Sequence, residues 1–187
     1  NDRQYIVTVN TGTGDGTLAL RYGSAVVGLT SDSSVSFGST PSEVVAGDFN
    51  NDGYQDIAVA VMGTNAVSVS LGNGDGTFAS ASQYASLGTS PFSLGKADVD
   101  GDGDLDLAVA NQGSRSVVVL RNDGNGGFTP LQSLPGAAVP RSVDFGDFNG
   151  DGRADLLIAY DTGQLMISLN TGSQFLGGSL IASGGAI

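Results

Sequence analysis

Aspartates at alternate positions dominate one short stretch of this chain. Residues 98–106 read DVDGDGDLD, and their carboxylates belong to Asp98, Asp100, Asp102, Asp104 and Asp106. Carboxylates so close together repel one another unless a cation neutralises them, and hard divalent cations prefer oxygen ligands. The stretch therefore predicts a cation-binding loop.

The same nine-residue frame occurs three times. Residues 48–56 read DFNNDGYQD and residues 147–155 read DFNGDGRAD, so that successive frames begin 50 and 49 residues apart. Ten of the 19 acidic residues fall at positions 1, 3, 5 and 9 of these frames. A merely solvated acidic surface would not place its charges in register, so the repetition favours one metal site in each copy.

The frame D-x-[DN]-x-D-G-x-x-D suits calcium, which takes six to eight oxygen ligands. Positions 1, 3, 5 and 9 offer side-chain oxygens, position 7 offers its backbone carbonyl, and the glycine at position 6 permits the sharp bend. About three Ca²⁺ ions are predicted, with the second frame, which has four acidic ligands, binding most tightly. The predicted ligands are Asp48, Asn50, Asp52, Tyr54 and Asp56; Asp98, Asp100, Asp102, Asp104 and Asp106; and Asp147, Asn149, Asp151, Arg153 and Asp155.

Two other metal-site types fit the frame less well. An EF-hand would need a bidentate Glu at position 12 and flanking helices, but that position holds Val59, Val109 and Ile158 within apolar segments. Magnesium prefers a small octahedral shell with several waters, which would leave most of these oxygens unused. Magnesium is therefore the lesser alternative.

Composition excludes several classes of function. A net charge of −12 with only seven Lys and Arg argues against nucleic acid or an anionic membrane as a partner. The absence of Cys and His removes disulfides, zinc sites, thiol nucleophiles and the usual general base. No apolar run approaches the roughly 20 residues that cross a bilayer, so no membrane insertion is expected. The sequence predicts that this chain is not an enzyme.

Each acidic frame belongs to a longer repeating unit. An apolar segment follows (DIAVAVM, DLAVAN or DLLIAY), then an alternating segment, a glycine turn such as LGNGDGTF, and a last short strand. Four antiparallel strands in about 50 residues indicate an all-β fold of β-propeller-type blades, about three and a half to four repeats. The predicted units are residues 41–90, 91–139 and 140–187, which carry the calcium loops 48–56, 98–106 and 147–155.

The first 40 residues are expected to form an irregular or partial N-terminal blade. Strands are predicted at 4–9 and 17–22, on either side of a glycine turn that begins at Asn10. About 13 extra residues, around 25–37, form either an insertion or another strand pair, or the whole segment is one irregular blade. Among the aromatic residues, Phe49 and Phe148 recur in register and are predicted to lie in the core.

The three frames, with their apolar strands and the turns NGDGTF and NDGNGGF, resemble the FG-GAP or VCBS repeats of integrin-α-like β-propellers. The resemblance covers about residues 37–175, and Phe37-Gly38 stands where that family has its Phe-Gly. It implies a calcium-stabilised propeller in a secreted, extracellular or cell-surface protein. Adhesion and the recognition of a protein or carbohydrate ligand are the roles it implies.

Such propellers usually have seven blades, which leaves three arrangements open here. The chain is a piece of a longer protein, or a small propeller closes with four blades, or open edges pair with other copies of the chain. The leading hypothesis is a recognition or adhesion module with structural calcium. The alternatives are a self-assembling structural protein that forms an edge-to-edge oligomer or filament, with the apolar segment SLIASGGAI as a possible strand donor, and a non-catalytic part of a larger enzyme.

Overall fold

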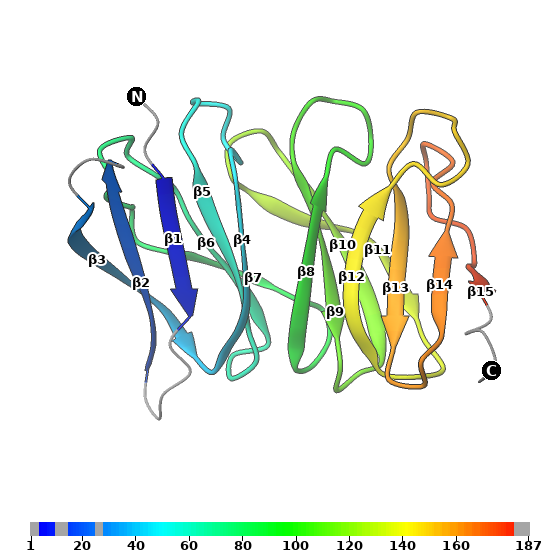
Figure 1. Ribbon diagram of the computed structural model, residues 1–187. Coiled ribbons are helices and arrows are strands. Elements are labelled where there is room, and N and C mark those ends of the chain that lie inside the picture. The colour runs from blue at the N-terminus through cyan, green and yellow to red at the C-terminus, as the bar shows by residue number, and fades with distance from the viewer. Residues whose placement is uncertain (1–3, 10–14, 25–27, 182–187) are drawn as a thin grey trace.

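The computed structural model describes residues 4–9, 15–24 and 28–181, and over these residues every regular element is a β-strand. The strands form four antiparallel sheets that stand side by side along the chain (Figure 1). This arrangement confirms the predicted all-β, blade-type fold, in an open rather than a closed form. No helix in the described part of the chain is long and apolar enough to cross a membrane.

Three of the sheets have four strands each, paired in chain order, and are called blades I, II and III below. Blade I comprises β4 (Pro41–Gly47), β5 (Asp56–Val61), β6 (Ala66–Ser70) and β7 (Ser82–Ala85). Blade II comprises β8 (Pro91–Ala97), β9 (Asp106–Asn111), β10 (Ser116–Asn122) and β11 (Phe128–Pro135). Blade III comprises β12 (Pro140–Gly146), β13 (Asp155–Tyr160), β14 (Leu165–Ser168) and β15 (Ser179–Ile181).

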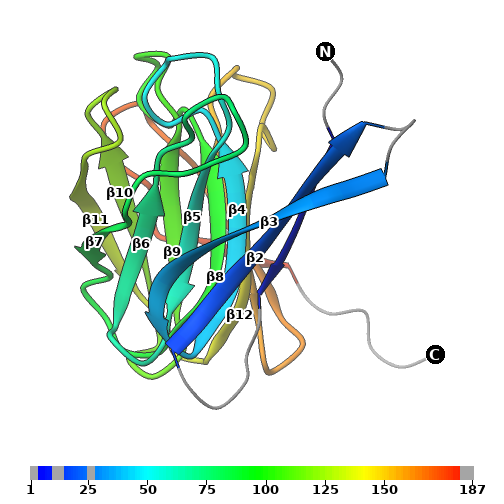
Figure 2. The same ribbon diagram turned by 90° about the vertical axis from the view of Figure 1, so that its left-hand side faces the viewer.

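The N-terminal sheet has three strands, β1 (Gln4–Val9), β2 (Asp15–Ser24) and β3 (Gly28–Ser39). The strands predicted at 4–9 and 17–22 are confirmed, whereas the Asn10 turn lies outside the described residues. Residues 28–39 form one long strand that pairs with β2, instead of an insertion or a strand pair. Figure 2 shows this sheet diverging from the stacked blades. The division of the chain at residues 40, 90 and 139 stays a prediction.

The blades pack face to face because each middle strand is apolar on both sides. In β5, Ala58 and Ala60 face blade II, and their small side chains make room for Leu107 and Val109 of β9. The opposite face of β5 carries larger residues, which pack against β3. A strand buried on both faces must be apolar throughout, which explains the unbroken DIAVAV sequence.

The contact between blades II and III repeats this pattern. Ala108 and Ala110 of β9 face blade III, where Leu156 and Ile158 of β13 pack against them. Blades I and II therefore present the small residues of their second strand to the next blade, and blades II and III present larger aliphatic residues to the preceding one. The stack remains open beyond blade III, where Leu157 takes the place of Ala58 and Ala108 and is partly exposed.

The prediction that both Phe49 and Phe148 lie in the core is wrong for Phe148. Phe49 is fully buried, whereas 45% of the Phe148 side chain is exposed. Both residues follow the first strand of their blade instead of lying within it. The Phe49 ring is covered by Phe128 of blade II, with ring centroids 5.7 Å apart. Phe148 is exposed because no described blade follows blade III.

Candidate metal sites in the acidic loops

The three acidic frames form the loops β4–β5, β8–β9 and β12–β13, which lie together at the upper ends of the sheets in Figure 1. Position 6 has a positive φ in every loop, as the bend requires. Position 4 also has a positive φ: 59° at Asn51, 81° at Gly101 and 79° at Gly150. Gly adopts this conformation without strain, and Asn is among the few other residues that favour it. The nine-residue frame predicts only the bend at position 6, although the Asn and Gly residues at position 4 are a sequence signal for this second constraint.

The aspartate at position 1 closes each loop. In the second loop, Asp98 accepts hydrogen bonds from the backbone N–H groups of Gly101 (2.7 Å) and Gly103 (3.0 Å). Asp48 and Asp147 accept the corresponding bonds from Gly53 and Gly152, at 2.8 and 2.9 Å. The N–H groups of Gly152 and its neighbours lower the pKa of Asp147, because they stabilise the carboxylate.

The aspartate at position 9 is fully buried in all three loops and begins the second strand of its blade. Asp106 accepts backbone hydrogen bonds from Val99 in its own loop (2.9 Å) and from Asn122 at the glycine turn (2.8 Å). Asp56 accepts the same pair from Phe49 and Gly72, and Asp155 accepts it from Phe148 and Asn170. One carboxylate in each blade therefore joins the acidic loop to the glycine turn.

Burial makes the charge of this carboxylate costly in the second loop. Desolvation raises the pKa of Asp106 to about 6, although the hydrogen bonds from Val99 and Asn122 oppose the change. Repulsion from the nearby carboxylates of Asp100 and Asp102 also contributes to this raised pKa. Burial also raises the pKa of Asp56. A cation among these groups would offset both the desolvation and the mutual repulsion.

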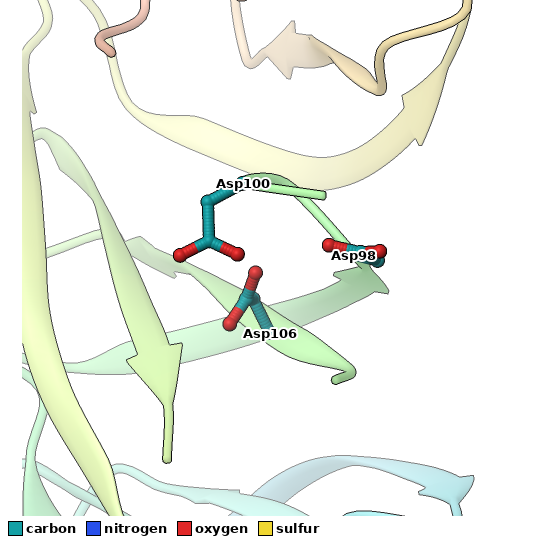
Figure 3. Close-up of side chains that lie close together, drawn as sticks. All are labelled: Asp98, Asp100 and Asp106. Atoms are coloured by element: carbon teal, nitrogen blue, oxygen red, sulfur yellow. The ribbon is translucent and has the colours of Figure 1, made fainter. Parts of the chain in front are cut away.

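Three carboxylates converge in the second loop. Oxygen atoms of Asp98, Asp100 and Asp106 all lie within 4.8 Å of one another, and Figure 3 shows the carboxylates of Asp100 and Asp106 facing each other. Hard oxygen donors gathered in this way fit a calcium ion. Three of the five ligands predicted in this loop are thus brought together. Asp102 instead accepts a hydrogen bond from the N–H of Asp104, the position-7 residue, at 2.9 Å.

In the first and third loops, the predicted ligands also hydrogen-bond to one another. The position-3 amides of Asn50 and Asn149 donate to Asp52 and Asp151, both at 2.8 Å. The position-7 residues Tyr54 and Arg153 donate their backbone N–H to the same aspartates. The Arg153 guanidinium also contacts Asp151, so the third loop already contains one positive charge.

Two asparagines that the sequence reasoning missed join the blades at these loops. The Asn122 side-chain amide donates to the Phe49 carbonyl of blade I (2.8 Å) and to the Leu105 carbonyl (3.1 Å). Asn170 makes the equivalent bond to the Val99 carbonyl of blade II, at 2.7 Å. These two side chains are called the hook asparagines below. The recurrence of Asn at the start of the glycine turn is the signal that could have identified them.

Comparison with known proteins relates the sequence to a repeat family. A sequence profile of the FG-GAP-like repeat matches residues 48–109 and 98–158. No curated protein matches the sequence significantly.

Three solved structures have a similar fold. One is a functionally unknown protein from Desulfotomaculum acetoxidans (TM-score 0.69, 16% identity, covering 96% of this chain and 52% of that one). Another is an Agrocybe aegerita lectin that recognises non-reducing terminal N-acetylglucosamine (TM-score 0.59, 20% identity, 97% and 52%). The third is BBS1N, solved in complex with ARL6DN (TM-score 0.57, 12% identity, 95% and 54%). This chain therefore spans about half the length of these proteins.

The hook asparagines should contribute measurably to stability. Replacing Asn122 by Ala removes the donor to two backbone carbonyls, and leaving buried acceptors unsatisfied costs about 1–3 kcal/mol. The free energy of unfolding in urea should fall by that amount. The control is Asn125→Ala in the same glycine turn, where the exposed amide donates only to the Asp123 carbonyl (3.1 Å) and the loss should stay below about 0.5 kcal/mol. Equal losses in the two variants would contradict the proposed role.

Asp106 should make the stability of the calcium-free protein depend on pH. Its pKa is about 6 in the folded chain against an ordinary value of 3.8, so unfolding releases its proton between these limits. The contribution of Asp106 to stability is therefore largest below about pH 4 and is lost as the pH rises through about 6. Thermal midpoints in EDTA are compared for the parent and Asp106→Asn. The advantage of the parent should shrink between pH 4 and 6.5 and stay constant above; an advantage that grows over that range would contradict the assignment.

Proposed function

We propose that this chain, which belongs to the FG-GAP-like repeat family, is a calcium-stabilised extracellular scaffold that binds a protein or carbohydrate partner. The observation that carries the calcium part of the proposal is the convergence of Asp98, Asp100 and Asp106, with a buried carboxylate at its base. Extracellular modules of this kind work at the 10⁻⁴ to 10⁻³ M calcium affinities that acidic loops can reach.

The proposed calcium ligands are those at positions 1, 3, 5, 7 and 9 of all three loops, for about three ions. Bound calcium would supply the positive charge that offsets repulsion among the carboxylates. The backbone bonds to Asp98 and Asp106 hold these side chains in place, so little ordering is left for the ion to impose. In the third loop the contact between Arg153 and Asp151 competes with a cation, which favours weaker binding there.

A binding role is favoured over a catalytic one by how the acidic groups are used. The buried aspartates at position 9 are each held by two backbone N–H groups, and the chain has no His or Cys. Among proteins of similar fold, the Agrocybe aegerita lectin recognises a sugar and BBS1N was solved with a protein partner. These examples support a protein or carbohydrate as the class of ligand.

Tyr54 is the residue we propose as a contact for such a partner. Its side chain is 49% exposed at the first acidic loop. A Cβ atom placed on Gly74 would lie 2.5 Å from the Tyr54 ring, so the ring lies directly against the glycine turn. A large, rigid aromatic side chain with a polar hydroxyl gains contact area at little entropic cost.

Removal of calcium should destabilise the protein. A site saturated at about 100 times its Kd adds about 2.7 kcal/mol, so excess EDTA should lower the thermal midpoint by about 5–10 °C for each such site. Calorimetric titration should give about three ions, and one fewer for Asp98→Asn. The control Asp144→Asn alters an exposed aspartate outside the loops and should bind like the parent. A melting curve that EDTA leaves unchanged would refute the calcium proposal.

The recognition role is tested separately, on a glycan array and a panel of extracellular matrix proteins in millimolar calcium. Tyr54→Ser should weaken binding to any ligand found there by about tenfold or more, the loss expected of an aromatic contact, with no change in the thermal midpoint. The control is Tyr84→Phe. The Tyr84 hydroxyl donates to the Gly126 carbonyl between blades and is not proposed as a ligand contact, so this variant should bind the ligand like the parent. Calcium binding without any ligand would leave the metal sites standing and refute the recognition role.

A further inference from the structure

A cavity of about 200 Å³ lies between blades II and III, at the ends of the sheets that are remote from the acidic loops (Figure 1). Arg115 of the β9–β10 turn lines it from blade II, and Asp161 and Thr162 of the β13–β14 turn line it from blade III. Residues 137–139, in the link from β11 to β12, complete the lining. The volume is below that of sites for drug-sized ligands, so it suits a smaller molecule. The site is called the lower cavity below.

The corresponding space between blades I and II is crossed by hydrogen bonds. There the link runs over residues 86–90, and the N–H of Ser90 donates to the side-chain oxygen of Asn65 at 2.8 Å. The Ser86 hydroxyl donates to the Asn65 carbonyl at 2.9 Å. The link between blades II and III spans only residues 136–139, which are a glycine, two alanines and a valine. Its side chains therefore cannot bond the neighbouring turns.

Arg115 occupies a strained position at the lower cavity. Its φ is 53°, the same value as at Asn65 of blade I. The two residues are equivalent, because the carbonyl of each accepts the N–H of the first link residue, Ser86 (3.1 Å) or Gly136 (2.7 Å). Asparagine tolerates this backbone conformation, whereas arginine seldom adopts it. Asn65 uses its side chain to bind the link, but the Arg115 guanidinium makes no hydrogen bond or ion pair to any residue that the structure describes. Strain at a residue whose side chain stabilises nothing in the chain indicates a functional role.

Asp161 places a carboxylate in the same cavity. Its Oδ1 atom accepts the N–H of Val139 at 3.2 Å, and its own N–H donates to the Val139 carbonyl at 3.0 Å. These two bonds hold the aspartate beside the link. Both Asp161 and Arg115 are among the described residues, yet no ion pair joins them. The cavity therefore offers a cation and an anion that do not neutralise each other, next to the apolar side chains of residues 137–139.

We propose that the lower cavity binds a small zwitterion of the α-amino acid class. The carboxylate of the ligand contacts the Arg115 guanidinium, whose planar fork matches a carboxylate. Its ammonium group contacts Asp161, and its aliphatic side chain lies over Ala137 and Ala138. A simple anion is repelled by Asp161 and a simple cation by Arg115, so both charges are needed. The inference does not depend on calcium, because the cavity lies at the opposite end of the blades from the acidic loops.

The binding test uses L-valine and two analogues that each lack one charged group. Isovalerate lacks the amine and isobutylamine lacks the carboxylate, while both keep the aliphatic part. Binding to the full chain is measured by NMR titration, once in calcium and once in EDTA. L-valine should bind at least about tenfold more tightly than either analogue under both conditions, because each analogue leaves one charged side chain of the cavity unpaired.

Three variants locate the binding site. Arg115→Asn introduces the residue that blade I carries at the equivalent position with the same φ, so the thermal midpoint without ligand should be unchanged or higher. L-valine binding should nevertheless weaken by about tenfold or more. Asp161→Asn keeps an acceptor for the Val139 N–H, and L-valine and isovalerate should then bind alike. The control Arg121→Asn removes the same charge from an exposed position on β10 outside the cavity and should bind like the parent.

The proposal is wrong if the parent binds none of the three probes, or if L-valine binding survives Arg115→Asn. Equal binding of L-valine and isovalerate to the parent would also contradict it, because the cavity would then be a simple anion site. Calcium titration of the Arg115→Asn variant should match that of the parent, so this proposal and the calcium proposal can fail independently.

Discussion

The structure depends on a buried carboxylate that accepts two backbone hydrogen bonds, repeated once in each blade. Asp56, Asp106 and Asp155 each bind one N–H from the acidic loop and one from the glycine turn, two segments more than ten residues apart in the chain. A buried carboxylate is costly unless such donors satisfy it. The carboxylate that holds the acidic loop therefore also aligns it with the glycine turn of the same blade, so the position of the charged loop depends on the geometry of the sheet.

This coupling extends from one blade to the next. The hook asparagines donate to the carbonyls of Phe49 and Val99, each of which follows the first residue of an acidic loop. Asn51 in the first loop donates to Asp104 in the second, at 2.6 Å. Polar contacts of this kind join the loops beside the apolar faces, where small residues of one blade pack against larger aliphatic residues of the next. The stack therefore behaves as a repeat array, in which each unit is stabilised mainly by its neighbours.

The two ends of the array differ in a consistent way. Blade I is covered by β3 and has Gly72 in place of a hook, whereas blade III leaves its apolar face and Phe148 exposed. An array of repeats needs a capped end to keep its apolar faces from water. The N-terminal sheet performs this function at one end, and the asymmetry gives the stack a direction.

The sequence by itself determined the strands of the three repeats, their order and the acidic loops, because these follow from local alternation and from residue spacing within about 50 residues. It did not determine β3, which lies outside the repeat. Spacing alone predicts a cation-binding loop at residues 98–106, but it does not predict the grouping of Asp98 and Asp100 around the buried Asp106. Only the tertiary structure decided that Phe49 is buried while Phe148 is exposed, although both occupy the same place in the repeat. The difference arises because burial depends on whether another blade follows, and the composition of a single repeat carries no information about its neighbour. The contacts of the hook asparagines were likewise decided only by the tertiary structure, because their acceptors lie 73 and 71 residues away in the chain.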